Sequence, residues 1–424
     1  MTTLRGILPV FPATDKATGK RRGVLAVACG AHALHDGYTD LIYVLLPIWQ
    51  TEFGLSYAAL GALRMLCAGS MAGLQVPATA VARRLGTPLV LALGTTLSAC
   101  AYLAIGLTGA GFVVLAAALL VGGAGSATQH PLASTLIARA YDGHGARAAL
   151  GTYNFSGDLG KMALPAATAW LLAVMSWRHA LGVVGMLGLL TAFCILLFLP
   201  RSLDGAGAGS LQATTPAPHH LAGKSRLGRG FTLLLVIGVL DSATRMGFLA
   251  FLPFVLRAKG ASTPIIGLAL TLVFVGGAVG KLACGLLGAR LGVLRTVILT
   301  ELATAAGIMA LAPLPLMAAL TCLPIIGIAL NGTSSVLYGT VPELVSPDRR
   351  EHAFGLFYTG TIGGGAIAPV IYGLVGDAIG PDHAIVIVAA VCLATLPLAW
   401  LLAPLLPTHE AGVVPAQRRR PTPT

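Results

Sequence analysis

Long apolar segments, separated by short polar ones, run along almost the whole chain. Each apolar segment has about 20 residues, the length that an α-helix needs to cross the hydrocarbon core of a bilayer. Transmembrane β-barrels show shorter segments of alternating hydrophobicity, and this sequence has no such alternation. The pattern predicts an all-α polytopic membrane protein with twelve transmembrane helices. These are expected at residues 24–48, 57–82, 87–107, 111–137, 149–174, 179–199, 231–256, 264–288, 294–313, 316–341, 352–376 and 384–406.

Composition and charge favour lipid surroundings. Hydrophobic residues make up 56% of the chain and charged residues 10%, whereas soluble domains carry about 25% charged residues. The formal charge of +12 could suggest a nucleic-acid partner. However, 20 of the 27 Lys and Arg residues fall in the two tails and the even-numbered loops, and only three fall in the odd-numbered loops. This positive-inside bias predicts a multi-pass protein of the bacterial inner membrane, with both termini in the cytoplasm and no nucleic-acid partner.

The only long internal segment rich in Gly, Ser, Pro and Ala divides the chain into two halves. The N-terminal segment lacks the apolar core of a cleavable signal peptide, so it is expected to be a tail. We expect an N-terminal tail (1–22), a first six-helix bundle (23–200), a cytoplasmic linker (201–230), a second six-helix bundle (231–406) and a C-terminal tail (407–424).

The two halves are related in sequence. At an offset of 206 residues, Leu46-Pro47 matches Leu252-Pro253, and at an offset of 204 residues Gly160 matches Gly364. Two parallel six-helix repeats are typical of secondary transporters, in which the halves rock about a site near the midplane. The seven cysteines all lie in apolar segments and have no metal-binding spacing, so we expect no metal and no cofactor.

This organisation resembles the major facilitator superfamily over essentially the whole chain. The superfamily's loop between its second and third helices typically contains Gly-x-x-x-Asp-Arg-x-Gly. The matching residues here include Arg83 and Arg84 in the first half and Ala289-Arg290 in the second, so both acidic positions are lost. The resemblance implies that Arg83, Arg84 and Arg290 belong to gating loops. In the superfamily the aspartate of this motif helps to hold the cytoplasmic side closed, so its loss implies that this contact is weaker here or is made by other residues.

A closer likeness is to the fosmidomycin-resistance group of proton-coupled exporters. His32-x-x-x-Asp36, His130-Pro131 and Trp177-Arg178 are the residues that resemble this group. Gln129 before the His-Pro pair and the second histidine, His35, depart from its pattern. The resemblance implies export of a drug or metabolite in exchange for protons, by a protein expected to act as a monomer.

Four ionisable residues lie in the first apolar segment, where a charge costs roughly 2.5–3.5 kcal/mol by insertion scales. His32, Asp36 and Asp40 recur at i, i+4 and i+8 and form a stripe on one helix face, with His35 at its border. We predict that these three couple transport to protons, with Arg64 opposite Asp36 as the counter-charge. The alternative for Asp40 is that it lies at a solvated end of the helix. His35 is expected to serve in packing or in the polar lining of the site.

Other charges in apolar segments are candidate substrate or counter-charge residues. Asp158 and Lys161 (i, i+3) can neutralise each other, as can Asp241 and Arg245 (i, i+4), so local structural pairs are the alternative interpretation. Arg64 and His130 complete the predicted set. Among the remaining charges, we expect gating or capping for Lys281, Glu343 and Asp377, and pairing with a loop arginine for Glu301.

Besides a proton-coupled exporter of small organic compounds, the sequence allows other function classes to be considered. An uptake symporter would have the same outline, with Arg64, Lys161 and Arg245 binding a carboxylate or phosphate. An intramembrane metalloenzyme with His32, His35, Asp36 and His130 as ligands fits less well, because no recognised zinc motif is present and an enzyme does not explain the repeat. The sequence shows no channel filter and no P-loop. We therefore predict a transporter and not an enzyme.

Overall fold

The computed structural model describes residues 16–107, 111–141, 143–199 and 228–406, and every regular element in these ranges is helical. The predicted linker and tails lie mostly outside the described residues. The first half contains α1 (Lys16–Asp40), α2 (Ile42–Phe53), α3 (Tyr57–Leu85), α4 (Thr87–Leu107), α5 (Gly111–Ser126), α6 (Gln129–Ala140), α7 (Gly143–Val174) and α8 (Trp177–Phe198). The second half contains α9 (Arg229–Ala258), α10 (Thr263–Leu291), α11 (Val293–Leu311), α12 (Leu316–Thr340), α13 (Arg350–Ile379), α14 (Pro381–Leu393) and α15 (Thr395–Leu402), with short 3₁₀ turns at Val341–Glu343, Pro347–Arg349 and Ala403–Leu405.

These helices confirm the predicted spans, three of which are each divided into two helices. The α5/α6 division at residues 127–128 and the α14/α15 division at Ala394 lie three to four residues before Pro131 and Pro397, whose ring nitrogens cannot donate the helical hydrogen bond. The α1/α2 division at Leu41 keeps helical dihedral angles (φ −62°, ψ −21°). Among the described residues, ten spans are long and apolar enough to cross a bilayer by length and composition. The two remaining spans, α1 with α2 and α7, contain the charged residues discussed below.

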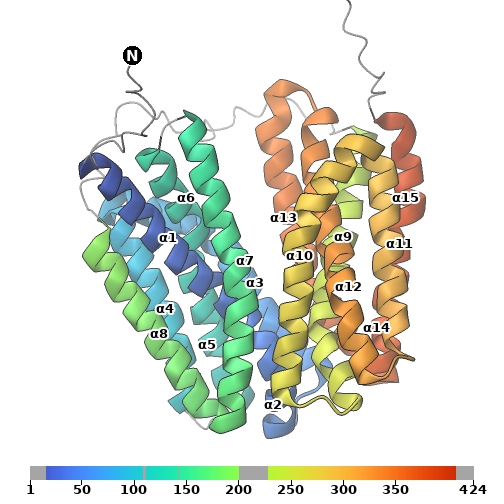
Figure 1. Cartoon of the computed structure of the whole chain (residues 1–424), viewed down its shortest axis with the longest axis horizontal. Coiled ribbons are helices and arrows are strands. Elements are labelled where there is room, and N and C mark those ends of the chain that lie inside the picture. The colour runs from blue at the N-terminus through green and yellow to red at the C-terminus, as the bar shows by residue number, and fades with distance from the viewer. Residues whose placement is uncertain (1–15, 108–110, 142, 200–227, 407–424) are drawn as a thin grey trace, which may run out of the picture.

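Figure 1 shows two bundles that approach each other at one end and diverge toward the other. Helix α1 begins and helix α15 ends at the diverging side, which we call the open end. The opposite side, where α2 and the start of α3 lie, is the closed end. Near the closed end the helices of the two halves pack backbone to backbone, because a Cβ atom on Gly61 would lie 2.7 Å from the nitrogen of Val370 and one on Gly373 would lie 2.6 Å from the Cα of Ala58.

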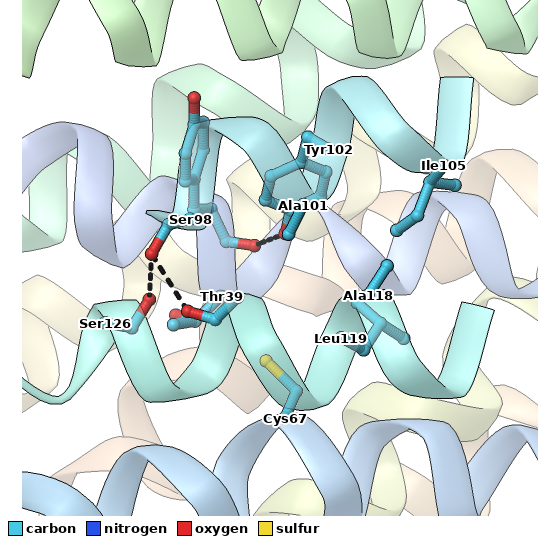
Figure 2. Close-up of a pocket in the computed structure, with 11 residues that line it drawn as sticks. Thr39, Cys67, Ser98, Ala101, Tyr102, Ile105, Ala118, Leu119 and Ser126 are labelled. Carbon is cyan, nitrogen blue, oxygen red and sulfur yellow. Dashed lines mark hydrogen bonds between the residues drawn. The ribbon is translucent and has the colours of Figure 1, made fainter. Parts of the chain in front are cut away.

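Polar contacts inside the first half hold α1 in place. The hydroxyl of Tyr102 donates a hydrogen bond to the backbone oxygen of Tyr38, whose own hydroxyl donates to the oxygen of Val184 at 2.7 Å. Figure 2 shows Ser98 of α4 bonded to α5, where its hydroxyl lies 3.2 Å from that of Ser126. The two tyrosine bonds fix α1 immediately before its division at Leu41, which is the part of the helix that contains the ionisable stripe.

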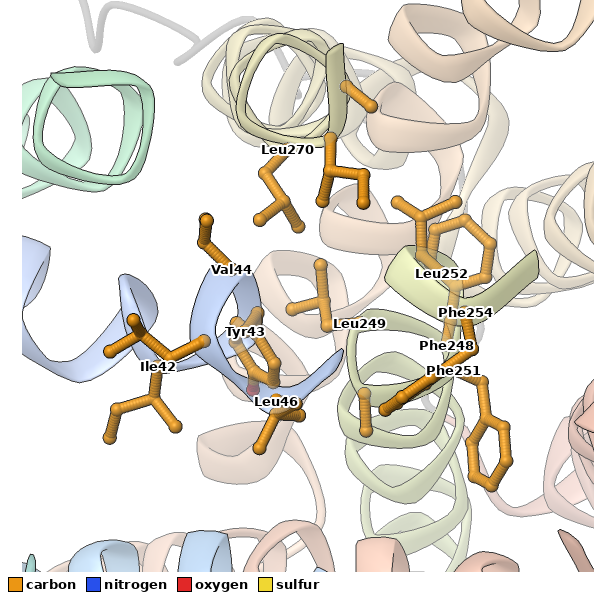
Figure 3. Close-up of a cluster of buried hydrophobic side chains, with 14 of the residues drawn as sticks. Ile42, Tyr43, Val44, Leu46, Phe248, Leu249, Phe251, Leu252, Phe254 and Leu270 are labelled. Carbon is orange, nitrogen blue, oxygen red and sulfur yellow. The ribbon is translucent and has the colours of Figure 1, made fainter. Parts of the chain in front are cut away.

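An apolar cluster seals the closed end between the halves. Figure 3 shows Tyr43 and Leu46 of α2 facing Phe251 and Leu252 of α9, with Leu270 of α10 nearby. All five side chains are at most 3% exposed. Burial of large apolar side chains of this kind is worth about 1.5–3 kcal/mol each relative to an exposed position. The cluster therefore separates the interior of the molecule from the closed end.

Asp377 and Arg257 make polar contacts between the halves at the closed end. The Asp377 carboxylate of α13 accepts hydrogen bonds from the backbone nitrogens of Tyr57 and Ala58, at 2.7 and 3.0 Å. The Nη1 atom of Arg257 donates to the oxygen of Pro47 at 2.9 Å. Asp377 thus caps the first turn of α3 in the other half, which confirms the predicted capping role.

Candidate functional site

A cavity of about 750 Å³ lies between the two halves. It is lined by α3, α6 and α7 of the first half and by α9, α10, α12 and α13 of the second. Its charged or ionisable lining residues are Arg64, His130, Asp241, Arg245 and Lys281. Tyr338, Phe357 and Tyr358 add aromatic surface. Such a mixture of apolar walls and a few converging polar groups suits a small organic molecule.

The Asp36 carboxylate is the centre of a buried group of ionisable side chains. The Nζ atom of Lys161, from α7, lies 3.2 Å from Asp36 Oδ2. On the other carboxylate oxygen, Oδ1, three imidazoles converge: the Nε2 atom of His32 lies at 3.4 Å, and those of His35 and His130 lie at 3.8 Å. We call these five residues the Asp36 cluster. The structure places His32 and Asp36 on one face of α1, as their spacing predicted, and His35 belongs to the cluster as well.

Glycines of α7 make room for this cluster. A Cβ atom on Gly157 would lie 2.6 Å from Asp36 Oδ2 and 2.6 Å from the Cε1 atom of His32. A Cβ atom on Gly160, one turn later, would lie 2.7 Å from the Cα of Ala33. Helix α7 can therefore lie directly against the ionisable face of α1 only because these positions lack side chains. Gly160 is recognisable in the sequence as a repeat position, whereas the contact of Gly157 with the cluster was not predicted.

Hydrogen bonding fixes the tautomer of His32. Its Nδ1 atom lies 2.7 Å from the backbone oxygen of Tyr153, which can only accept, so Nδ1 bears a hydrogen. In the neutral imidazole Nε2 is then an acceptor, and it faces the Asp36 carboxylate, which when ionised is also an acceptor. Nε2 is buried and has no other hydrogen-bond partner. A proton on either His32 or Asp36 turns this contact into a hydrogen bond.

The cluster reaches the cavity through its more exposed members. The side chain of Asp36 is 9% exposed, whereas those of His130 and Lys161 are 35% and 30% exposed. His130 also lines the cavity directly. The histidine that follows Gln129 at the start of α6 is therefore the connection between the buried carboxylate and the cavity.

Arg64 does not lie opposite Asp36, so that prediction is wrong. Its Nη2 atom lies 3.8 Å from Asp40 Oδ1, and its Nε atom donates to the hydroxyl of Tyr43 at 3.2 Å. Asp40 is 7% exposed, so the alternative of a solvated helix end is also wrong. The reason is that the chain continues through Leu41 into α2, which keeps Asp40 inside the bundle.

Asp158 and Lys161 do not pair with each other either. Lys161 contacts Asp36, whereas Asp158 Oδ1 lies 2.6 Å from the Nζ atom of Lys281 in the second half. Positions three apart on α7 thus face two different neighbours, α1 and α10. Lys281, expected only to gate or cap, forms an ion pair that bridges the halves beside the cavity.

The second half contains a different arrangement around Asp241. Among the described residues, Arg245 has no nitrogen within 4 Å of the Asp241 carboxylate, and its Nη1 atom donates instead to the Ser334 hydroxyl at 3.4 Å. The Asp241 side chain is in hydrogen-bonding reach of Glu301. Glu301 is 2% exposed and accepts from Cys392 Sγ at 2.9 Å. The expected pairing of Glu301 with a loop arginine is wrong, because Glu301 lies about two turns inside α11 and faces α14.

The predicted gating residues lie away from the cavity. Arg83 and Arg84 are exposed in the last turn of α3, and Arg290 is exposed in the last turn of α10. Cations at these positions interact favourably with the helix C-termini. Their part in gating stays a prediction.

Three members of the Asp36 cluster could also hold a metal ion. The ligand atoms of His32, Asp36 and His130 lie within 4.8 Å of one another. Imidazole and carboxylate groups are ligands that zinc and related metals accept. The Lys161 ammonium, 3.2 Å from the same carboxylate, already neutralises it and would repel a metal ion. This arrangement disfavours a resident metal.

Comparisons with known proteins agree with this architecture. The fosmidomycin resistance protein of Escherichia coli (strain K12) is 25% identical over 418 residues, which cover 95% of this chain and 97% of that protein. A bacterial homolog of the human lysosomal transporter Spinster, solved in an inward-facing and unoccupied conformation, superposes with a TM-score of 0.72 at 18% identity over 91% of this chain and 98% of that one. The nucleoside transporter NupG gives a TM-score of 0.71 at 14% identity, over 91% of this chain and 98% of that one.

The family model of the Major Facilitator Superfamily matches residues 28–239 and 234–423, which together span both halves. The two matched regions correspond to the two six-helix repeats. The chain therefore belongs to the major facilitator superfamily and is a multi-pass membrane transporter, not an enzyme.

Proposed function

We propose that the protein exports a small organic compound in exchange for protons, by alternating access of the central cavity. The observation that supports this most is the contact between His32 and Asp36, whose facing atoms are both acceptors unless a proton is added. The similarity to the Escherichia coli fosmidomycin resistance protein favours export.

Exchange follows from two alternative ways of neutralising Asp36. In one state the Lys161 ammonium, 3.2 Å away, balances the carboxylate. In the other a proton does so, and Lys161, whose side chain is already 30% exposed, is released from the carboxylate. A substrate that fits the cavity in one arrangement binds less well in the other, and this differential affinity links the proton to the substrate. His130, which lines the cavity, gives the proton a route to Asp36.

The positive-inside bias implies that the open end faces the cytoplasm. The cavity then accepts its substrate from inside the cell, as an exporter requires. The apolar cluster and the contacts of Asp377 and Arg257 close the other side. We further propose the bacterial inner membrane as the location and a monomer as the working unit, because one chain encloses the whole cavity.

Uptake of an organic anion by proton symport is the second candidate. Three cations, Arg64, Arg245 and Lys281, line the cavity against one carboxylate, Asp241. Guanidinium groups bind carboxylate or phosphate with two parallel hydrogen bonds. This excess of positive charge is the observation that favours an anionic substrate.

Inverted membrane vesicles with an acidic lumen distinguish the two candidates. We use fosmidomycin as the first probe, followed by a panel of small organic compounds. Antiport predicts that adding a substrate outside raises the lumenal pH and that the compound accumulates inside, both abolished by an uncoupler. Symport predicts that a preloaded compound is expelled together with protons. Transport that ignores the pH gradient would contradict proton coupling.

A further inference from the structure

Two carboxyl groups of the second half are buried without an ion-pair partner among the described residues. Asp241 on α9 is 4% exposed and Glu301 on α11 is 2% exposed. By contrast, Asp36, Asp40 and Asp158 each have a Lys or Arg nitrogen within 4 Å. An unpaired carboxylate is very costly to bury, and such a group normally becomes neutral by taking up a proton.

The hydrogen bonds around Glu301 point to a proton on its carboxyl group. The Thr395 hydroxyl lies 2.6 Å from the backbone oxygen of Cys392 and 3.3 Å from Glu301 Oε2. A hydroxyl has only one hydrogen, and the much shorter contact takes it. The longer contact between Thr395 and Oε2 then lacks a hydrogen of its own, and a protonated Glu301 carboxyl would supply it.

Asp241 connects Glu301 with the cavity. The two side chains are within hydrogen-bonding reach of each other, and two carboxyl groups can share such a bond only when one of them is protonated. Asp241 lines the cavity, whereas Glu301 does not. A proton can therefore pass from the cavity to Asp241 and then to Glu301.

The charged and titratable groups near this pair are few. Arg245 follows Asp241 by one turn of α9 and lines the cavity, with an Nε atom that is buried without a hydrogen-bond partner. On α14, Cys392 Sγ lies 2.9 Å from Glu301 Oε2. Lys281 on α10 is paired with Asp158. No described cation within 4 Å neutralises either carboxyl group.

We infer that Asp241 and Glu301 form a second proton-binding site, in which Glu301 holds the proton and Asp241 exchanges it with the cavity. The sequence repeat agrees with this placement, because the counterpart of Asp241 at the offset of 206 residues is His35 of the Asp36 cluster. The use of this proton in transport rests on the proposed function, whereas the protonation of Glu301 does not.

Infrared spectroscopy of the purified protein in lipid at neutral pH tests the protonation. Wild type should show the C=O band of a protonated carboxylic acid, and Glu301→Gln should lose it. The amide of glutamine has nearly the size of a neutral carboxyl group, so this variant should fold. Glu52→Gln is the matched control, because Glu52 is an exposed carboxylate 2.9 Å from Arg178, and it should keep the band.

Exchange into heavy water tests the part of Asp241. The band should shift quickly in wild type and at least several-fold more slowly in Asp241→Asn. A wild-type spectrum without the band, or a band whose intensity Glu301→Gln leaves unchanged, would overturn the proton site. Equal exchange rates in wild type and Asp241→Asn would overturn the route through Asp241. Because no transport is measured, these outcomes are independent of whether proton antiport is correct.

Discussion

The two halves differ in the surroundings of the carboxyl groups in their transmembrane helices. In the first half Asp36, Asp40 and Asp158 each face a cation, at 3.2, 3.8 and 2.6 Å. In the second half Asp241 and Glu301 face no cation within 4 Å among the described residues. Removing a charge from the first half therefore leaves a partner unpaired, whereas removing one from the second half leaves no cation behind. The first half is thus suited to exchanging the cations that face its carboxylates. The second half, which has the same repeat, is suited to storing a proton.

Packing, unlike charge, is shared by the two halves. Gly160 lies against Ala33, and its repeat counterpart Gly364 lies against Val239, which is the counterpart of Ala33 at the offset of 206 residues. The charges differ at matched positions, since Lys161 corresponds to Gly365. The small residues are therefore needed for the fold of both halves. At this matched pair of positions a charge occurs in only one half, where it serves the function of that half.

The largest expected effect on transport is that of removing Lys161. Lys161→Met leaves the Asp36 carboxylate with imidazoles alone, so we expect gradient-driven transport to fall by about tenfold or more, which corresponds to about 1.4 kcal/mol or more. Lys161→Arg should keep part of the activity. Initial rates in inverted vesicles measure both.

Lys281→Met is the comparison variant, because Lys281 is 40% exposed and pairs with Asp158 instead. It should lower the rate less than Lys161→Met. An equal loss in the two variants would contradict the central position of the Asp36 cluster.

Asp40→Asn should destabilise the first half, because it leaves the buried Arg64 without its carboxylate. Breaking a buried pair by removing one partner costs about 3–5 kcal/mol, and the 3.8 Å separation favours the lower end of that range. Thermal unfolding in detergent measures the loss. Glu52→Gln breaks an exposed pair worth about 0–1 kcal/mol and is the control. Equal melting temperatures would show that the Asp40–Arg64 pair has no structural importance.

Gly157→Ala should disturb the Asp36 cluster without changing any charge. The added methyl group would lie 2.6 Å from Asp36 Oδ2, and overpacking of this kind costs about 1–3 kcal/mol. We expect a lower melting temperature and slower transport. Gly151→Ala on the same helix is the control, because nothing lies within 4 Å of its added Cβ atom. Equal melting temperatures and equal transport rates of the two variants would contradict the close packing of α1 against α7.

The smallest effect is expected from an exposed carboxylate at the closed end. Asp377→Ala removes the cap from α3, and lost caps cost about 0.5–2 kcal/mol. Because this cap joins the halves, its loss should shift the equilibrium toward the state that is open at the other side. Labelling of a cysteine introduced at Thr51, which Arg257 contacts at 3.2 Å, measures that opening. Unchanged labelling would show that the cap does not hold the closed end.

The sequence was sufficient to predict the twelve spans and the repeat, because length, hydropathy and residue offsets are local properties. It also identified Asp36 and His32, since their spacing of four places them on one face of α1. The choice of partners could not be predicted. Spacing does not say which helix faces a given side chain, so Lys161 was assigned to Asp158, and Arg64 to Asp36.

Glu301 was missed for a related reason. A single glutamate near the start of an apolar segment suggests a residue at the membrane surface. In the structure, Cys392 and Thr395 of two other helices surround it. Neither residue is ionised or forms a recognisable motif with Glu301, so no signal in the sequence joins them.

The most direct test of the central claim compares two activities of Asp36→Asn in the same vesicles. Asparagine keeps the shape of the side chain but cannot bind and release a proton. We predict that this variant loses accumulation driven by the pH gradient but still exchanges labelled for unlabelled substrate across the membrane. Gradient-driven accumulation equal to that of wild type would contradict the assignment of Asp36 as the coupling residue.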